Sequence, residues 1–126
     1  MALVNQVKKN IRMELWDIVR FQIHLYCYLN KILVTDQNLE CLTLLALRSE
    51  DEIGEFCDKA ADQKIFANSQ SARSALATLE KKGLINTFKI GRSKKRLKLN
   101  PAVIIQSSGN ILLDLKIIRI EPQEGK

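Results

Sequence analysis

The sequence has little of what most enzymes and metalloproteins depend on. It holds one histidine (His24) and three cysteines in 126 residues. It contains neither a G-x-x-x-x-G-K-[ST] phosphate loop nor a G-x-S-x-G nucleophile elbow. The histidine lies in an alternating apolar segment, where a core or surface role is far commoner than catalysis. We therefore expect no enzymatic activity, no catalytic residues, no cofactor and no metal site.

Long apolar runs are also missing. No run approaches the ~18–20 residues of a membrane span, and no signal peptide is expected at the start of the chain. The cysteines (Cys27, Cys41 and Cys57) are odd in number and show no C-x-x-C spacing. They predict reduced core thiols in a cytoplasmic protein. The lack of a long apolar run predicts that the protein has no membrane partner. The length and the 46% hydrophobic content predict a single domain over residues 1–126.

Acidic residues are absent from one stretch. Between Lys81 and Lys98 there are eight basic residues and no acidic ones, whereas the rest of the chain has 12 basic and 14 acidic residues. The net charge of +6 therefore originates in this stretch. Concentrated positive charge favours a polyanionic partner, because neutralised phosphates release condensed counterions. The alternative is a solvated hairpin whose lysines prevent edge-to-edge aggregation.

A helix is predicted just before this stretch, over Gln70–Lys82, with Ser69 as its N-cap. Its buried face is marked by apolar spacing at Ala72, Ala75, Leu76 and Leu79. Its exposed face carries Gln70, Ser74, Ala77 and Lys81, flanked by Arg73 and Thr78. Gly83 follows at a position where a helix end favours positive φ.

Two alternating runs around residues 91–94 predict a β-hairpin that ends at Asn100-Pro101. Its apolar face is expected to contain Phe88, Ile90, Leu97 and Leu99. Its basic face is expected to contain Lys89, Arg96 and Lys98.

Two more helices are predicted upstream. The first is capped by Thr35 and buries Leu39, Leu42, Leu45 and Ala46. The second opens with a capping box over Ser49–Glu52 and buries Ile53, Phe56, Cys57 and Ala60. Residues 61–68 then form either a longer connection or an extension of this helix to about Lys64, and Ile65 and Phe66 are expected to close the core.

This succession, above all LATLEKKGLI followed by a hairpin, resembles a winged helix-turn-helix over about residues 34–101. The connection over 61–68 departs from it, since the usual turn has roughly 3–4 residues. The resemblance is to phage and plasmid regulators. It implies an α+β fold and a non-enzymatic protein that binds double-stranded DNA to regulate transcription or replication. The base-reading residues it implies are Gln70, Ser71, Arg73, Ser74 and Thr78. The phosphate-binding and wing residues it implies are Lys81, Lys82, Lys89, Arg92, Lys94, Lys95, Arg96 and Lys98.

The two ends of the chain are less regular. Residues 1–12 predict an N-terminal arm or a frayed helix. Alternation over residues 16–30 favours a strand, and the alternative is a helix that buries Ile18, Leu25 and Leu29. Residues 102–121 (AVIIQ and ILLDLKIIRI around Ser107–Asn110) predict a C-terminal hairpin. Either the N-terminal strand or another subunit would cover it, and we expect self-association through these C-terminal strands.

A second hypothesis follows from these strands. A structural virion protein, such as a phage head-to-tail connector or ring component, would use the winged helix for protein–protein assembly. Its basic hairpin would then contact an acidic virion protein or packaged DNA. The protein would be found in the host cytoplasm or the virion.

Overall fold

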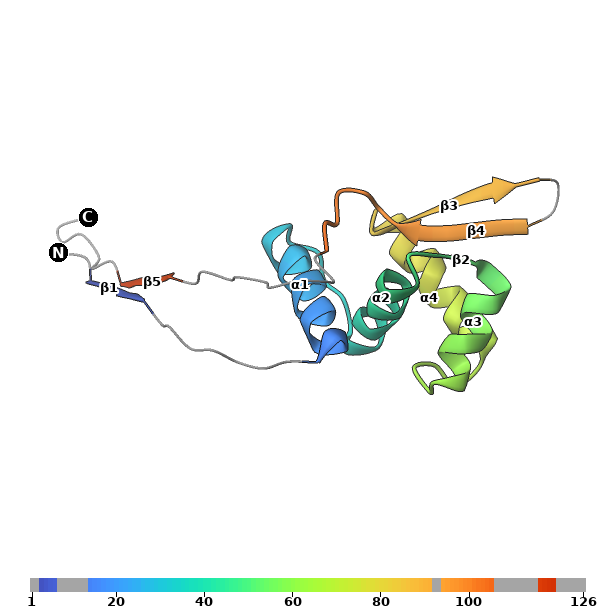
Figure 1. Cartoon of the computed structure of the whole chain (residues 1–126), viewed down its shortest axis with the longest axis horizontal. Coiled ribbons are helices and arrows are strands. Elements are labelled where there is room, and N and C mark those ends of the chain that lie inside the picture. The colour runs from blue at the N-terminus through green and yellow to red at the C-terminus, as the bar shows by residue number, and fades with distance from the viewer. Residues whose placement is uncertain (1–2, 7–13, 92–93, 106–115, 120–126) are drawn as a thin grey trace.

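The computed structural model describes residues 3–6, 14–91, 94–105 and 116–119 (Figure 1). In chain order the elements are β1 (Leu3–Gln6), α1 (Leu15–Leu29), α2 (Asp36–Arg48), β2 (Glu50–Glu52), α3 (Ile53–Asp62), α4 (Ser69–Lys81), β3 (Ile85–Ile90), β4 (Lys94–Leu99) and β5 (Lys116–Arg119). The predicted α+β class is confirmed.

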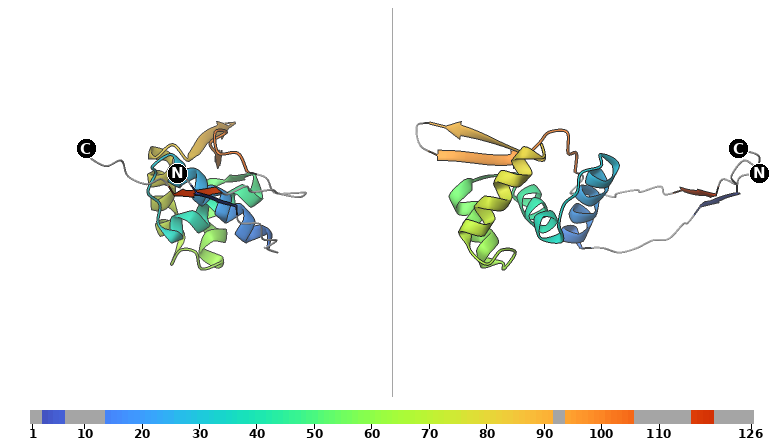
Figure 2. Two further views of the ribbon diagram at one scale, coloured as in Figure 1. Left: turned by 90° about the vertical axis from the view of Figure 1, so that its left-hand side faces the viewer. Right: turned by 180° about the vertical axis from the view of Figure 1, so that it is seen from behind.

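The main sheet is antiparallel, with the strand order β2-β4-β3. It lies beside the helices, and the β3–β4 hairpin extends beyond them (Figures 1 and 2). The order of helix α2, strand β2, helices α3 and α4 and then the hairpin is consistent with a winged-helix-like layout.

The core lies between the helices and the inner face of this sheet. Leu45, Phe56, Leu79 and Leu97 are fully buried in it. Ile65 and Phe66, which follow α3, are also buried and close the core as predicted. The apolar spacing of α3 and α4 therefore identified their buried faces. Helix α2 buries the predicted Leu39, Leu42 and Leu45, but it also buries Cys41, Thr43 and Leu44, which the spacing did not indicate.

Helix α1 occupies the segment predicted as a strand over residues 16–30, so the predicted strand is wrong. The buried positions of α1 are Val19, Ile23 and Cys27, four residues apart along one face. The alternative helix face was also wrong, because Leu29 is 68% exposed. Alternation over a short segment places apolar residues all round a helix, and the packing of α1 against α2 decides which ones are buried.

The capping box at Ser49 is also wrong. Ser49 adopts φ 66°, and the next three residues form β2, which pairs with β4. The N-cap of α3 is Glu52, whose carboxylate accepts from the backbone N–H groups of Gly54 (3.0 Å) and Glu55 (2.9 Å). By contrast, Thr35 caps α2 as predicted, accepting from the Asn38 N–H.

Helix α4 begins one residue earlier than predicted. Its N-cap is Asn68, whose side-chain oxygen accepts from the Ser71 N–H at 2.9 Å. Ser69 is not the cap, and its hydroxyl donates to Asp58 at 2.6 Å. Gly83 follows the helix with φ 77°, as expected.

The predicted faces of the hairpin are wrong. Phe88 lies opposite Arg96, and Ile90 lies opposite Lys94, so the outer face mixes apolar and basic residues. The inner face carries Ile85, Thr87, Lys89, Lys95, Leu97 and Leu99. The expected loop over 91–94 would have paired Phe88 with Leu97. The strands leave only residues 91–93 between them, and this one-residue difference moves every β4 side chain to the other face.

The terminal strands β1 and β5 pair with each other, with Leu3 opposite Arg119 and Gln6 opposite Lys116 (Figure 1). The C-terminal strand thus does have an N-terminal partner, but this partner lies within the expected arm and not within residues 16–30. Residues 102–105 of the expected first C-terminal strand form a turn and an irregular segment. The Ser107–Asn110 turn lies outside the described residues.

All three cysteines are buried free thiols, as predicted. Burial raises the pKa of Cys27 and Cys57, and raises that of Cys41 to about 12 with a contribution from nearby Cys57. Within the described ranges, none of the helices has both the length and the apolarity that crossing a membrane requires.

Candidate nucleic-acid interface

The exposed face of α4 carries all five predicted base-reading residues. Each of them is solvent-exposed in the structure: Gln70, Ser71, Arg73, Ser74 and Thr78. At 3.6 residues per turn, Gln70 and Ser74 share the middle of this face. Arg73 lies on the flank towards the hairpin, whereas Ser71 and Thr78 lie on the other flank. The Thr78 hydroxyl donates to the Ser74 carbonyl at 3.2 Å, which leaves its oxygen available as an acceptor.

A groove of about 230 Å³ runs between α4 and the hairpin. It is lined by Ile53, Arg73, Leu76, Ala77, Glu80, Thr87 and Lys95. Two predicted residues from different elements, Arg73 of α4 and Lys95 of β4, therefore border the same space. The groove therefore has one cation on a helix and another on the hairpin.

Arg73 also lies close to the first turn of α3. A methyl group placed on Gly54 would lie 3.6 Å from the Arg73 Nη2 and 3.2 Å from both carboxylate oxygens of Glu52. Arg73 and Glu52 also both affect the buried Cys57 thiol. Burial raises the pKa of this thiol most; the Arg73 guanidinium lowers it, and the carboxylates of Asp58 and Glu52 raise it further. The guanidinium therefore borders both the groove and the acidic cap of α3.

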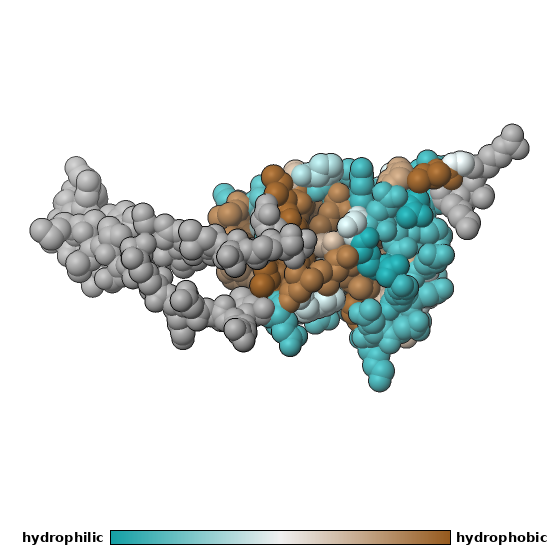
Figure 3. All heavy atoms as spheres, in the orientation of Figure 1, coloured by the Kyte–Doolittle hydropathy of each residue, from teal (hydrophilic) through white to brown (hydrophobic). Residues whose placement is uncertain are grey.

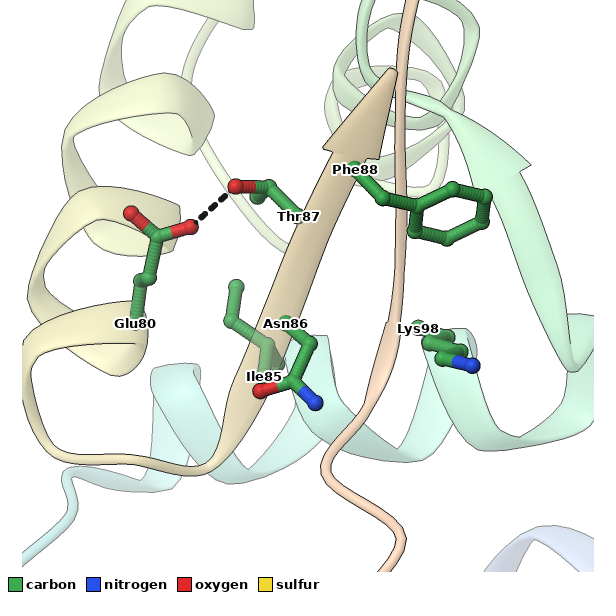
Figure 4. Close-up of a pocket in the computed structure, with 6 residues that line it drawn as sticks. All are labelled: Glu80, Ile85, Asn86, Thr87, Phe88 and Lys98. Carbon is green, nitrogen blue, oxygen red and sulfur yellow. Dashed lines mark hydrogen bonds between the residues drawn. The ribbon is translucent and has the colours of Figure 1, made fainter. Parts of the chain in front are cut away.

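Glu80 is a groove residue that the sequence did not single out. Figure 4 shows its carboxylate pointing from α4 towards β3, where it accepts a hydrogen bond from the Thr87 hydroxyl. Glu80 comes directly before the acid-free stretch in the sequence. Its position there was the signal that a negative charge borders the basic region. The bond ties the helix to the base of the hairpin.

The basic residues of the hairpin differ in what surrounds them. On the outer face, Arg96 forms an ion pair with Glu50 at 2.8 Å, and the Lys98 ammonium lies 5.4 Å from the centre of the Phe88 ring. On the inner face, Lys89 and Lys95 lie directly opposite each other. The ion pairs found among the described residues include neither of these two lysines. Like charges on facing residues repel each other, and an anion bound between the two ammonium groups would relieve this repulsion.

The remaining predicted phosphate-binding residues also differ in their surroundings. Lys81 is exposed on α4. The Lys82 ammonium donates to the Leu33 carbonyl and so contributes to the packing of the α1–α2 loop. Lys94 is the first residue of β4, and Arg92 lies outside the described residues.

The described residues contain no cluster of three or more histidine, cysteine, aspartate or glutamate side chains that would hold a metal ion. The groove is lined by a guanidinium, an ammonium, a carboxylate and a hydroxyl group. The guanidinium and the ammonium suit phosphate and base edges, whereas the carboxylate would repel phosphate.

No family model, curated protein or solved structure matches this chain. Its function is therefore inferred from the geometry of α4 and the β3–β4 hairpin.

Proposed function

We propose that the protein is a non-enzymatic winged-helix DNA-binding protein, in which α4 enters the major groove and the β3–β4 hairpin is the wing. The observation that carries this proposal is the shared groove of Arg73 and Lys95 beside the facing lysines of the hairpin. Isolated basic hairpins are common. A basic hairpin that shares a groove with the exposed face of a helix is a more specific arrangement.

The dimensions and chemistry of α4 support this role. Its 13 residues span about 20 Å, and the major groove of B-DNA, about 12 Å wide, admits an α-helix. Arg73 carries the fork of donors that suits the O6 and N7 atoms of guanine, and Gln70 suits adenine. Ser71, Ser74 and Thr78 offer short hydroxyl groups. With only two long polar side chains among these five, α4 would discriminate few base pairs.

The hairpin would supply affinity that does not depend on sequence. Lys89 and Lys95 are its best-placed phosphate contacts, because both face the groove side of the hairpin. Arg96 and Lys98 would contribute less, since one is paired with Glu50 and the other lies over Phe88. Such a protein would act as a transcription or replication regulator of the phage or plasmid type.

The direct test is fluorescence anisotropy on a random-sequence duplex at about 50 and about 200 mM salt. About six phosphate contacts would weaken binding by about a thousandfold over this range, because each contact releases counterions. Little binding at either salt concentration would reject the proposal.

A second candidate is a structural virion protein, and the terminal strands favour it. The two-stranded β1–β5 sheet has two edges, which strands of neighbouring subunits would extend. The variant Ile118→Pro removes one backbone donor from β5. If assembly is the function, light scattering will show large particles for the wild type and their loss in this variant. A wild-type particle no larger than a dimer would reject this candidate.

A further inference from the structure

Helix α1 has a second apolar face in addition to the one that packs on the core. Val19, Ile23 and Cys27 form the buried face. On the other side of the helix a second row consists of Ile18, Phe21, Leu25 and Tyr28. Its spacings of three, four and three residues are those of a helix–helix seam, in which apolar residues recur every 3.5 residues on average.

The two aromatic residues of this second row are exposed. Phe21 is 41% exposed and Tyr28 is 77% exposed. Ile18 and Leu25 are half-buried, and neither is among the described side chains that pack on the core cluster. Figure 3 shows hydrophobic residues gathered over the α1 half of the body, whereas the half with α3 is hydrophilic. Single exposed apolar residues are ordinary, but a row along a whole helix marks an interaction surface.

The apolar surface continues past the C-terminal end of α1. A groove of about 580 Å³ is lined there by Tyr28, Leu29, Leu33 and neighbouring residues. Leu29 and Leu33 are 68% and 86% exposed. Tyr28 belongs both to this groove and to the second row, so the two form one continuous surface.

We propose that this surface binds the same surface of a second copy of the chain, with the two α1 helices antiparallel. The spacing of the row reads the same in both directions. A two-fold axis midway between Phe21 and Leu25 therefore places Phe21 opposite Leu25 of the other copy, and Ile18 opposite Tyr28. Each contact then joins an aromatic ring to an aliphatic side chain, and every contact occurs twice, as an isologous interface requires.

The charges at the ends of α1 support the same arrangement. Glu14 and Asp17 lie at the N-terminal end of the helix, and Lys31 lies just beyond its C-terminal end. In an antiparallel pair the acidic end of each copy faces the lysine of the other, and the two helix dipoles are also opposed favourably. A parallel pair would place acid against acid and lysine against lysine. The charge pattern thus favours an antiparallel pair of copies over a parallel one.

The size of the surface predicts a reversible dimer. An aromatic side chain buries roughly 150–250 Å², so the exposed parts of Tyr28 and Phe21 supply roughly 240 Å² together. A standard interface buries about 800 Å² per partner. Leu29 and Leu33 add to the area, but the total stays at the small end of specific interfaces. In Figure 1, α1 lies at the end of the helical body away from the hairpin tip, so α4 and the hairpin stay accessible in both copies.

The test is sedimentation velocity on the full chain without DNA, over about 1 to about 100 μM. We expect a monomer–dimer equilibrium, and Tyr28→Glu should raise the dissociation constant at least about tenfold, since it places a charge at an apolar contact. Ile90→Glu is the matched control, because Ile90 is 57% exposed on the hairpin, and its dimer should be unchanged. A wild-type monomer at the highest concentration would overturn the proposal. So would a dimer that survives Tyr28→Glu but is lost in Ile118→Pro, since that dimer would be held by the terminal strands.

A charge-reversal experiment tests the direction of the helices. Lys31→Glu should weaken the dimer, and the double variant Glu14→Lys/Asp17→Lys should weaken it too. An equimolar mixture of the two variants should dimerise as well as the wild type, because both ends are then complementary in the mixed dimer. In a parallel pair Lys31 would already face its counterpart, so Lys31→Glu alone would change nothing. That result would overturn the antiparallel arrangement. Because DNA is absent from both experiments, their outcome is independent of the proposed DNA-binding function.

Discussion

Glu80 places a negative charge in the groove that we assign to DNA, and removing that charge should strengthen binding. Its carboxylate lines the groove with Arg73 and Lys95 and accepts the hydroxyl hydrogen of Thr87. Glu80→Gln removes the charge but keeps an amide oxygen that can accept the same hydrogen bond. The variant therefore separates the electrostatic role of Glu80 from its role in tying the hairpin to α4.

The size of the effect follows from Coulomb's law. A unit charge about 6 Å from a phosphate in water interacts with it by about 0.7 kcal/mol, which is about threefold in affinity. With a Debye length of about 8 Å at physiological salt, the gain should fall below about twofold. Anisotropy titrations of Glu80→Gln and wild type on one random duplex at two salt concentrations measure both values.

Thr87→Val is the matched variant, because it breaks the hydrogen bond and leaves the charge in place. It should not increase affinity at any salt concentration. If Glu80→Gln left low-salt binding unchanged or weakened it, the groove would not lie against phosphate. The assignment of DNA to this groove would then be refuted.

Three further predictions concern α4 and the core. Asn68→Ala should lower the free energy of unfolding, measured in urea titrations, by about 1 kcal/mol, because it removes the cap of α4. Ser69→Ala keeps the cap and should lower this free energy by less. A larger loss in Ser69→Ala than in Asn68→Ala would show that Ser69 is the cap. Because burial raises the Cys41 pKa from 9.0 to about 12, the unfolded chain loses that proton first as the pH rises. Stability should therefore fall above pH 9, and Cys41 should contribute about 1.4 kcal/mol of this loss at pH 10. The fall from pH 8 to pH 10 should be smaller by that amount in Cys41→Ala, and an equal fall would contradict the buried thiol. Arg73→Ala should cost about 1–3 kcal/mol of binding on a selected duplex and less on random DNA, and an equal loss on both would make Arg73 a phosphate contact.

The elements that the sequence predicted well are those whose signal is local. The apolar spacing of α3 and α4 gave their buried faces, and Gly83 marks the end of α4 through its positive φ. The exposure of Arg73 and its neighbours follows directly from the position of the buried face. This much of the candidate site needed no tertiary information.

The errors occurred where tertiary pairing decides the structure. In residues 50–52, a local capping pattern lost to strand pairing with β4, and the cap passed to Glu52. The hairpin faces depended on a loop shorter by one residue, which local composition does not reveal. In α1 the alternation was real, but it reflects a helix with two apolar faces. Such a helix shows the same alternation as a strand, so the pattern alone could not distinguish the two. The second apolar face is the one that we assign to a partner.

The groove between α4 and the hairpin could not be predicted from the sequence. Arg73 and Lys95 are 22 positions apart, and they border one space only because β4 lies between β2 and β3 with Lys95 on its inner face. If the two faces of β4 were exchanged, the Lys95 side chain would point away from α4. Register therefore decides which of the basic residues belong to the proposed interface.

The most direct measurement of the central claim is the salt dependence of binding for two matched double variants. Lys89→Gln/Lys95→Gln removes the facing lysines of the hairpin, and Lys59→Gln/Lys64→Gln removes two exposed lysines from the end of α3 and the turn after it. The net charge of the two variants is the same. On a random duplex, we predict that the hairpin variant lowers the slope of log affinity against log salt by about 2, while the α3 variant keeps the wild-type slope. Equal slopes for the two variants would contradict the assignment of the hairpin as a DNA-binding wing.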